Sequence, residues 1–268
     1  MCIRDRYYTK STRTDENIYR YDKFTIKMKE IFLKTEDNIK IAINYINNEN
    51  ESVVIICPGW FMTKDSKAFL KMSNDLSKYF DIITMDFRGH GKSSGFYTFS
   101  AREESDLKTV IDYAKSNNYE QIHLLGFSLG GALVLLQGEK TSNGISKIIT
   151  VSAPSEFYKI ENRMYSPDAW IPTLFHKFEP RRWLTIRAGN PFLKKRKPVD
   201  IIQNIKCPTL FIAGEKDPTV LPWHTKKLHD KATCRKAYKL FPKTRHAEDI
   251  YLDYPEEFIK TCVNWLKD

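Results

Sequence analysis

The stretch IHLLGFSLGGALVLL, residues 122–136, indicates the fold of the chain. Its first half is a short apolar run typical of a strand buried on both faces, and its second half is typical of a buried helix. Gly126 and Gly130 flank Ser128, and this spacing predicts a tight turn that joins the strand directly to the helix. We therefore expect Ser128 at the carboxyl edge of a parallel sheet.

The rest of the chain repeats this alternation of strands and helices. FTIKMKEIFL and IKIAINYI predict an antiparallel hairpin, and SVVIIC, DIITMDF, ISKIITV, PTLFIAG and RKAYKLF predict further strands with helical patterns between most of them. Ser100, three residues before Glu103, predicts a capping box that opens a helix. We expect an α/β protein with a mostly parallel eight-stranded sheet, an N-terminal antiparallel hairpin and helices on both faces.

One interval departs from this rhythm. Residues 155–206 separate two predicted strands, and a structureless loop of that length is uncommon in a compact domain. We expect a small inserted cap there, an α/β core at residues 25–154 and 207–268, and an N-terminal segment at residues 1–24. Its first six residues, MCIRDR, resemble a translated sequencing adapter, and we expect them not to belong to the natural chain.

Composition and charge exclude several classes of protein. Hydrophobic residues make up 41% of the 268 residues, enough for a sizeable core, and no apolar run reaches the roughly 18 residues that span a bilayer. The net charge of +10 comes without a nucleic-acid-binding motif, so we expect no nucleic-acid partner. The histidines and the five scattered cysteines lack metal-ligand spacing, so we expect no metal and no cofactor, and reduced thiols in a cytoplasmic protein. Export stays open, because the natural N-terminus is expected to be missing.

Ser128 needs a base and an orienting acid to act as a nucleophile. Asp217 follows the strand TLFIAG and His246 follows the strand RKAYKLF, so both fall at carboxyl ends of strands, in the order serine, acid, histidine. We predict these three residues as the catalytic set, with Glu215 and Glu156 as reserve candidates for the acid.

The groups around this serine follow from the same placement. The backbone N–H of Leu129 at the helix start and that of Trp60 in the loop CPGWFM are the expected oxyanion donors, with Phe61 N–H as a weaker alternative to Trp60. We expect His90, in the loop RGHGKS, to be structural. The aromatic residues predicted to contact substrate are Phe61, Phe127, Trp170 and Trp183.

The motifs CPGW, MDFRGHGKSSG, GFSLGG, AGEKDP and TRHAE together resemble serine hydrolases of the α/β-hydrolase superfamily. Within it, the chain is most similar to monoacylglycerol lipase-like, lysophospholipase-like and serine aminopeptidase-like proteins. The resemblance implies Ser128 as nucleophile, Asp217 as acid, His246 as base and a cap after the sixth strand. Relatives usually have His-Gly where this chain has Pro58-Gly59, and often glycine where it has Arg245.

These observations predict an enzyme that cleaves a carboxylic ester with a short, medium or lipid-like acyl chain through an acyl-enzyme. Thioester and amide substrates stay open, as does a non-catalytic hydrolase-fold protein that binds a lipid or another ligand. The predicted partner is a small-molecule ester. The basic cap, with eleven Lys and Arg against five Asp and Glu, also predicts peripheral contact with an anionic membrane, and a plain solvated surface is the alternative. The sequence does not indicate an oligomeric state.

Overall fold

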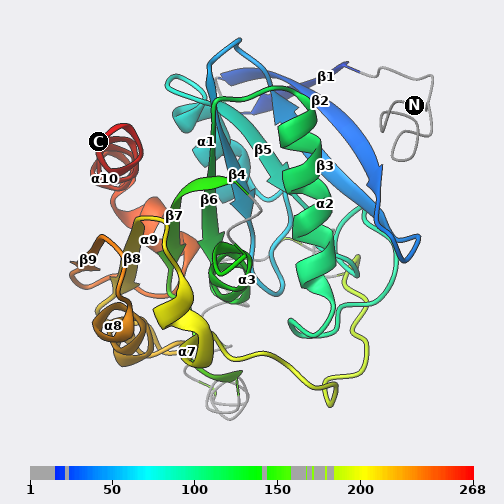
Figure 1. Ribbon diagram of the computed structural model, residues 1–268. Helices are drawn as coiled ribbons and strands as arrows, with labels where there is room; N and C mark the ends of the chain where they lie inside the picture. The colour runs from blue at the N-terminus through cyan, green and yellow to red at the C-terminus, as the bar shows by residue number, and fades with distance from the viewer. Residues whose placement is uncertain are drawn as a thin grey trace.

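A computed structural model describes residues 16–21, 24–140, 144–157, 167, 171, 179 and 184–268. The strands of this part form one nine-stranded sheet in the order β1-β2-β3-β5-β4-β6-β7-β8-β9 (Figure 1). Pairing is antiparallel from β1 to β5 and parallel from β5 to β9, so the predicted hairpin and parallel sheet are confirmed. The strands are β1 (Glu16–Tyr21), β2 (Phe24–Lys34), β3 (Lys40–Ile46), β4 (Ser52–Cys57), β5 (Asp81–Met85), β6 (Gln121–Phe127), β7 (Ile145–Val151), β8 (Thr209–Gly214) and β9 (Lys236–Phe241).

Strand β1 is an addition to the predicted eight strands. It pairs antiparallel with β2, with Glu16 opposite Lys29 and Tyr21 opposite Phe24, and so extends the edge of the sheet. Its sequence ENIYRY contains isoleucine and tyrosine, which favour strands, but it is too short and too polar to be identified without the partner strand.

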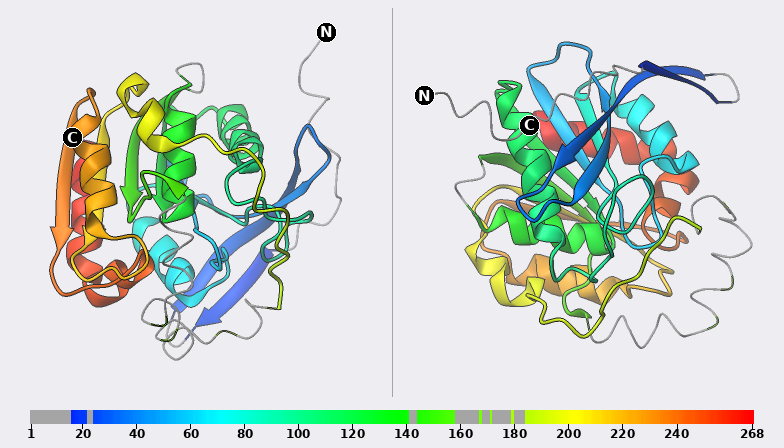
Figure 2. Two further views of the ribbon diagram at one scale, coloured as in Figure 1. Left: turned by 90° about the horizontal axis from the view of Figure 1, so that it is seen from below. Right: turned by 90° about the vertical axis from the view of Figure 1, so that its right-hand side faces the viewer.

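Helices cover both faces of this sheet, as predicted (Figure 2). In the described ranges, none of them combines the length and the apolar character needed to cross a bilayer. One face is covered by α2 (Glu103–Ser116), α3 (Leu129–Gly138), α7 (Pro198–Ile201) and α8 (Pro222–Lys231), and the other by α1 (Lys67–Leu76), α9 (Glu248–Asp253) and α10 (Pro255–Lys267).

The predicted capping box at α2 is wrong. The helix begins at Glu103, whose carboxylate accepts hydrogen bonds from Thr98 N at 2.6 Å and from Thr98 Oγ1 at 2.9 Å. Phe99 and Ser100 have φ values of 56° and 77°, so the backbone turns sharply before the helix. This turn places Thr98, rather than Ser100, against the Glu103 carboxylate.

Both ends of the predicted insertion, residues 155–206, pack into the core. Phe157 at its start is buried in the same cluster as Ile201 in α7 and Ile202 in the following 3₁₀-helix η3 (Ile202–Asn204). Most of its middle lies outside the described residues, so the inserted cap stays a prediction.

Candidate active site

Ser128 occupies the turn between β6 and α3. Its backbone has φ 53° and ψ −119°, a conformation that L-residues rarely adopt, and its N–H donates to the carbonyl of Val151 on β7 at 2.8 Å. The neighbouring strand thus holds the strained backbone in place. The strain turns the serine out of the strand direction, as a nucleophile at a strand-to-helix turn requires.

The two flanking glycines allow the chain to pass so closely. A Cβ built at Gly126 would lie 2.5 Å from the carbonyl oxygen of Gly130, across the turn. A Cβ built at Gly130 would lie 2.2 Å from the carbonyl oxygen of Cys57 at the end of β4. Any side chain at either position would therefore force backbone apart, which explains the spacing of the motif.

The structure brings Ser128, His246 and Asp217 into one hydrogen-bonded chain. Ser128 Oγ lies 2.9 Å from His246 Nε2, and His246 Nδ1 lies 2.7 Å from Asp217 Oδ2. A carboxylate can only accept, so Nδ1 carries a proton and Nε2 of the neutral imidazole is left to accept the serine proton. Ser128 is 7% exposed and Asp217 2% exposed, so the chain of contacts is largely shielded from bulk water.

Asp217 is fixed by its own backbone turn. Its second carboxylate oxygen, Oδ1, accepts hydrogen bonds from Thr219 N and Val220 N, both at 2.9 Å. This Asx-type turn orients Oδ2 toward His246. The dipeptide Asp217-Pro218 is typical of such a turn and is the sequence signal for the two N–H donors.

The loop that carries His246 is held to the sheet on both sides of the histidine. Lys216 N donates to Thr244 O at 2.9 Å, and Ala247 N donates to Ser152 Oγ at 3.2 Å, a contact that sequence reasoning missed. Arg245 has no positive φ, so the backbone before His246 needs no glycine.

The two reserve acids are used elsewhere. Glu215 Oε2 accepts a hydrogen bond from Lys243 N at 2.8 Å, and Glu156 pairs with Lys227 at 3.1 Å. Asp217 is therefore the carboxylate that the geometry associates with His246.

Two backbone N–H groups lie next to Ser128 without a protein acceptor in the described part of the chain. Leu129 N–H is the first of helix α3, where no intrahelical partner exists. Gly59 packs so closely on Ser128 that a Cβ there would lie 2.9 Å from Ser128 Cβ, which places Trp60 N, the next backbone nitrogen, beside the serine. Phe61 N–H instead donates to His90 Nε2 at 3.3 Å, so the donor considered second is already occupied.

The predicted substrate contacts divide into three groups. The centroid of the Phe61 ring lies 4.3 Å from that of the Trp60 ring, in the loop that packs on Ser128. Phe127 is fully buried between Phe69 of α1 and Phe258 of α10, because alternation along β6 points its side chain toward that face, so the structure assigns it to the core instead. The remaining two, Trp170 and Trp183, lie outside the described residues.

Comparisons with known proteins agree with this fold. A family model described as "alpha/beta hydrolase fold" matches residues 52–179. "Serine hydrolase BPHL" of Mus musculus is 25% identical over 254 residues, covering 85% of this chain and 86% of that protein. Its Homo sapiens counterpart is 22% identical over 260 residues, with the same coverage.

Solved structures show the same architecture. A Pyrococcus furiosus esterase superposes with a TM-score of 0.72 at 23% identity, covering 90% of this chain and 92% of that one. An esterase from Exiguobacterium antarcticum has a TM-score of 0.70 at 20% identity, covering 88% of this chain and 99% of that one. These likenesses establish the fold, whereas the narrower lipase-like group stays a prediction. The chain has the α/β-hydrolase fold and is an enzyme of the serine hydrolase type.

Proposed function

We propose that this enzyme hydrolyses carboxylic esters, with Ser128 as nucleophile, His246 as general base and Asp217 as the acid that orients it. The observation that carries the proposal is the pair of short contacts at the strained turn, 2.9 Å from Ser128 Oγ to His246 Nε2 and 2.7 Å from His246 Nδ1 to Asp217 Oδ2. The contacts match the distances that a serine nucleophile and its base require.

In the first half of the reaction, His246 Nε2 takes the Ser128 proton while Oγ bonds to the carbonyl carbon of the ester. The negative charge that develops on the carbonyl oxygen is stabilised by Leu129 N–H and Trp60 N–H. The intermediate collapses, the bond to the alcohol oxygen breaks, and His246 returns its proton to that oxygen. Asp217 stays ionised and stabilises the imidazolium throughout.

In the second half, water replaces the alcohol. His246 removes a proton from water, whose oxygen bonds to the acyl carbon, and the bond to Ser128 Oγ then breaks as His246 returns that proton to the serine. The products are a carboxylic acid and the free enzyme.

Ester is the substrate class that we favour, because an alcohol leaves more readily than an amine. The name of the Pyrococcus furiosus relative, an esterase, and that of a Burkholderia xenovorans relative, an enol-lactonase, agree with this choice. Thioester and amide hydrolysis would use the same three residues, and non-catalytic ligand binding would use none of their chemistry.

A panel of p-nitrophenyl esters of increasing chain length, run beside acyl-CoA and aminoacyl-anilide substrates, tests the proposal. We expect turnover of esters that is lost in Ser128→Ala. Ser155→Ala is the matched control: Ser155 is also buried and its Oγ lies 2.9 Å from His224 Nδ1, but it follows β7 and is not at the strand-to-helix turn. Equal losses in both variants, or preferential turnover of the thioester or the amide, would contradict the proposal.

A second proposal concerns an anionic membrane surface. Phe192 is 92% exposed and is followed by the basic residues 194–197, of which Lys194, Arg196 and Lys197 are exposed. Phe96 is 63% exposed. It lies close to Gly189, three residues before Phe192, because a Cβ built at Gly189 would be 3.1 Å from Phe96 Cβ. Exposed rings beside lysines are typical of peripheral contact with anionic lipid.

Sedimentation with phosphatidylserine and phosphatidylcholine vesicles tests this contact. We expect binding to the anionic vesicles that falls with salt and is lost when Lys194 and Lys197 are changed to glutamate. Binding that is unchanged by salt and by the two glutamate substitutions would contradict the membrane proposal. So would the absence of binding to anionic vesicles at low salt.

A further inference from the structure

The motif RGHGKS, residues 88–93, forms a loop that packs against the loop of residues 58–64, where Trp60 lies beside Ser128. Asp86 joins the two loops directly: its Oδ1 accepts a hydrogen bond from Lys64 N at 2.7 Å, and its Oδ2 accepts one from Lys92 N at 3.0 Å. The position of the loop that carries Trp60 therefore depends on Asp86, which is fully buried and lies outside that loop.

His90 makes a second and more specific connection between these loops. It is 1% exposed, its Nε2 accepts the hydrogen bond from Phe61 N, and its Nδ1 lies 3.3 Å from Arg88 O. Because an N–H donates to Nε2 and a carbonyl faces Nδ1, the partners fit only the neutral ring with its proton on Nδ1. The Tyr97 ring packs edge-on against His90 at 4.5 Å between centroids and fixes the plane of the imidazole.

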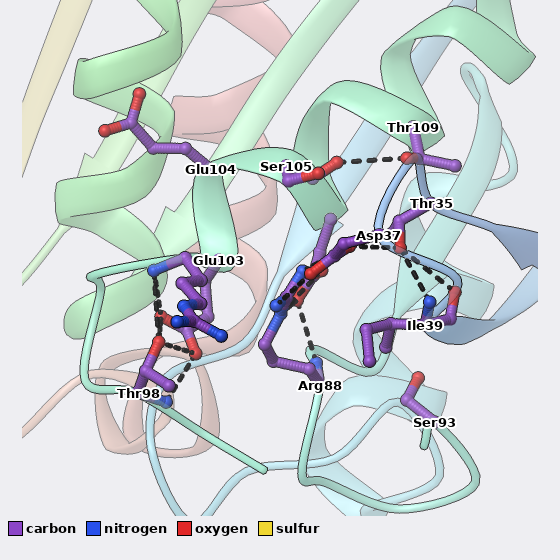
Figure 3. A network of polar contacts seen from close by, with 12 residues as sticks. Thr35, Asp37, Ile39, Arg88, Ser93, Thr98, Glu103, Glu104, Ser105 and Thr109 are labelled. Atoms are coloured by element: carbon purple, nitrogen blue, oxygen red, sulfur yellow. Dashed lines mark hydrogen bonds and ion pairs between the residues drawn. The ribbon is translucent and has the colours of Figure 1, made fainter. Parts of the chain in front are cut away.

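The carbonyl that orients His90 belongs to Arg88, whose side chain forms an ion-pair network with one buried and one half-exposed carboxylate (Figure 3). The guanidinium of Arg88 contacts Asp106 at 2.6 Å and Asp37 at 2.8 Å, and Arg88 N donates to Asp106 Oδ2 at 2.9 Å. The Arg88 backbone is thereby held to the start of α2, and its carbonyl is aimed at His90 Nδ1.

The hydrogen bond between Phe61 N and His90 determines which N–H of the loop is left to donate to an oxyanion. Phe61 has φ +60°, so the backbone reverses its direction at this residue, and its N–H points to His90 instead of into the site. The preceding nitrogen, Trp60 N, is the one beside Ser128, through the close packing of Gly59. The two nitrogens are joined through the Trp60 Cα, so anchoring Phe61 N to His90 also restrains the position of that Cα and of the Trp60 N–H bonded to it.

We propose that His90 is a positioning residue of the oxyanion hole: by accepting the Phe61 N–H, it keeps the Trp60 N–H aimed at the substrate carbonyl oxygen. The role rests on the proposed function, because it requires that an oxyanion forms at Ser128. His90 acts through Phe61 and Trp60 and does not touch the reacting atoms.

Two substitutions of His90 separate its hydrogen bond with Phe61 N–H from its packing against Tyr97. His90→Phe keeps a flat ring against Tyr97 and removes the acceptor, whereas His90→Gln can return an acceptor near the position of Nε2. We expect His90→Phe to lower kcat by about 10- to 100-fold with KM within about 3-fold, because an oxyanion donor acts in the transition state. His90→Gln should recover most of the loss.

Ser94→Ala, at the residue that directly follows this loop, is the matched control. Ser94 Oγ accepts a hydrogen bond from Lys40 N at 2.8 Å and does not contact the loop of residues 58–64, so turnover should stay within about 2-fold of the wild type. Melting temperatures of all three variants report any general loss of structure.

The affinity of an alkyl trifluoromethyl ketone completes the test, because its adduct with Ser128 places an oxyanion in the hole. Its Ki should rise in His90→Phe by the same factor by which kcat/KM falls, and should not change in Ser94→Ala. If the wild type is active but kcat and Ki are unchanged in His90→Phe, the role of His90 is overturned and the proposed function is not. An increase in KM without a loss of kcat in His90→Phe would have the same meaning. A wild type without turnover and without ketone inhibition would overturn the proposed function and this role together.

Discussion

His123 provides a quantitative test of how burial controls stability in this sheet. It lies inside β6, is fully buried, and neither ring nitrogen has a hydrogen-bond partner in the described part of the chain. The Phe80 ring packs edge-on against it at 6.0 Å, and Lys147 lies opposite on β7. Burial, together with the nearby charge of Lys147, lowers the pKa of His123 from 6.5 to about 4.

The sign of the pH dependence follows from this lowered pKa. Between pH 6.5 and about 4 the unfolded chain binds a proton at His123 that the folded chain does not, so the free energy of unfolding falls as the pH falls through this window. A shift of this size corresponds to about 3 kcal/mol in full, and to about 2.5 kcal/mol between pH 7 and pH 4.5.

Urea unfolding of the wild type and of His123→Leu at pH 7.0, 5.5 and 4.5 measures this effect. Subtracting one protein from the other at each pH removes the contributions of other titrating groups. We expect the wild type to lose about 2.5 kcal/mol in the free energy of unfolding relative to His123→Leu when the pH falls from 7 to 4.5.

His123→Asn is the control that separates loss of the titrating group from the change in apolar packing. It is polar but does not titrate in this range, so it should show the same flattened pH dependence at a lower absolute stability. If the differences between the wild type and both variants stay constant across the three pH values, the reasoning from burial is refuted.

Three further substitutions test the site and its supports. Asp217→Asn should lower kcat for an ester substrate by about 10⁴-fold with little change in KM, because the imidazole would adopt the wrong tautomer, whereas Glu215→Gln should keep most of the activity. Gly130→Ala should lower the free energy of unfolding by at least about 3 kcal/mol in urea titrations, since its Cβ would overlap backbone carbonyls, and near-wild-type stability would contradict the close approach. Arg88→Met should cost about 3 to 5 kcal/mol by leaving Asp106 buried without its ion pair, and the double variant Arg88→Met/Asp106→Leu should recover most of that loss in the same titrations.

Much of the site follows from local pattern and topology. The strand–turn–helix around Ser128 shows in fifteen consecutive residues, and Asp217 and His246 both follow predicted strands. Because the carboxyl ends of parallel strands share one edge of a sheet, their order along the chain was enough to predict that the three side chains meet.

What the sequence could not supply depends on contacts between distant segments. The acceptor of the Phe61 N–H is His90, 29 residues away, and no pattern near either residue marks the pair. Phe127 ends a strand buried on both faces, so its apolar character gives no indication of which face it occupies. The partner of the Glu103 carboxylate depends on the left-handed turn at Phe99 and Ser100, which a capping-box pattern does not reveal.

The central claim is that Ser128 is an activated nucleophile, and labelling with a fluorophosphonate probe followed by peptide mass spectrometry tests it most directly. We predict one adduct, on the peptide that contains Ser128, which disappears in Ser128→Ala and forms at least about 100-fold more slowly in His246→Gln. An unlabelled wild type, an adduct that persists in Ser128→Ala, or labelling of His246→Gln at the wild-type rate would contradict the claim.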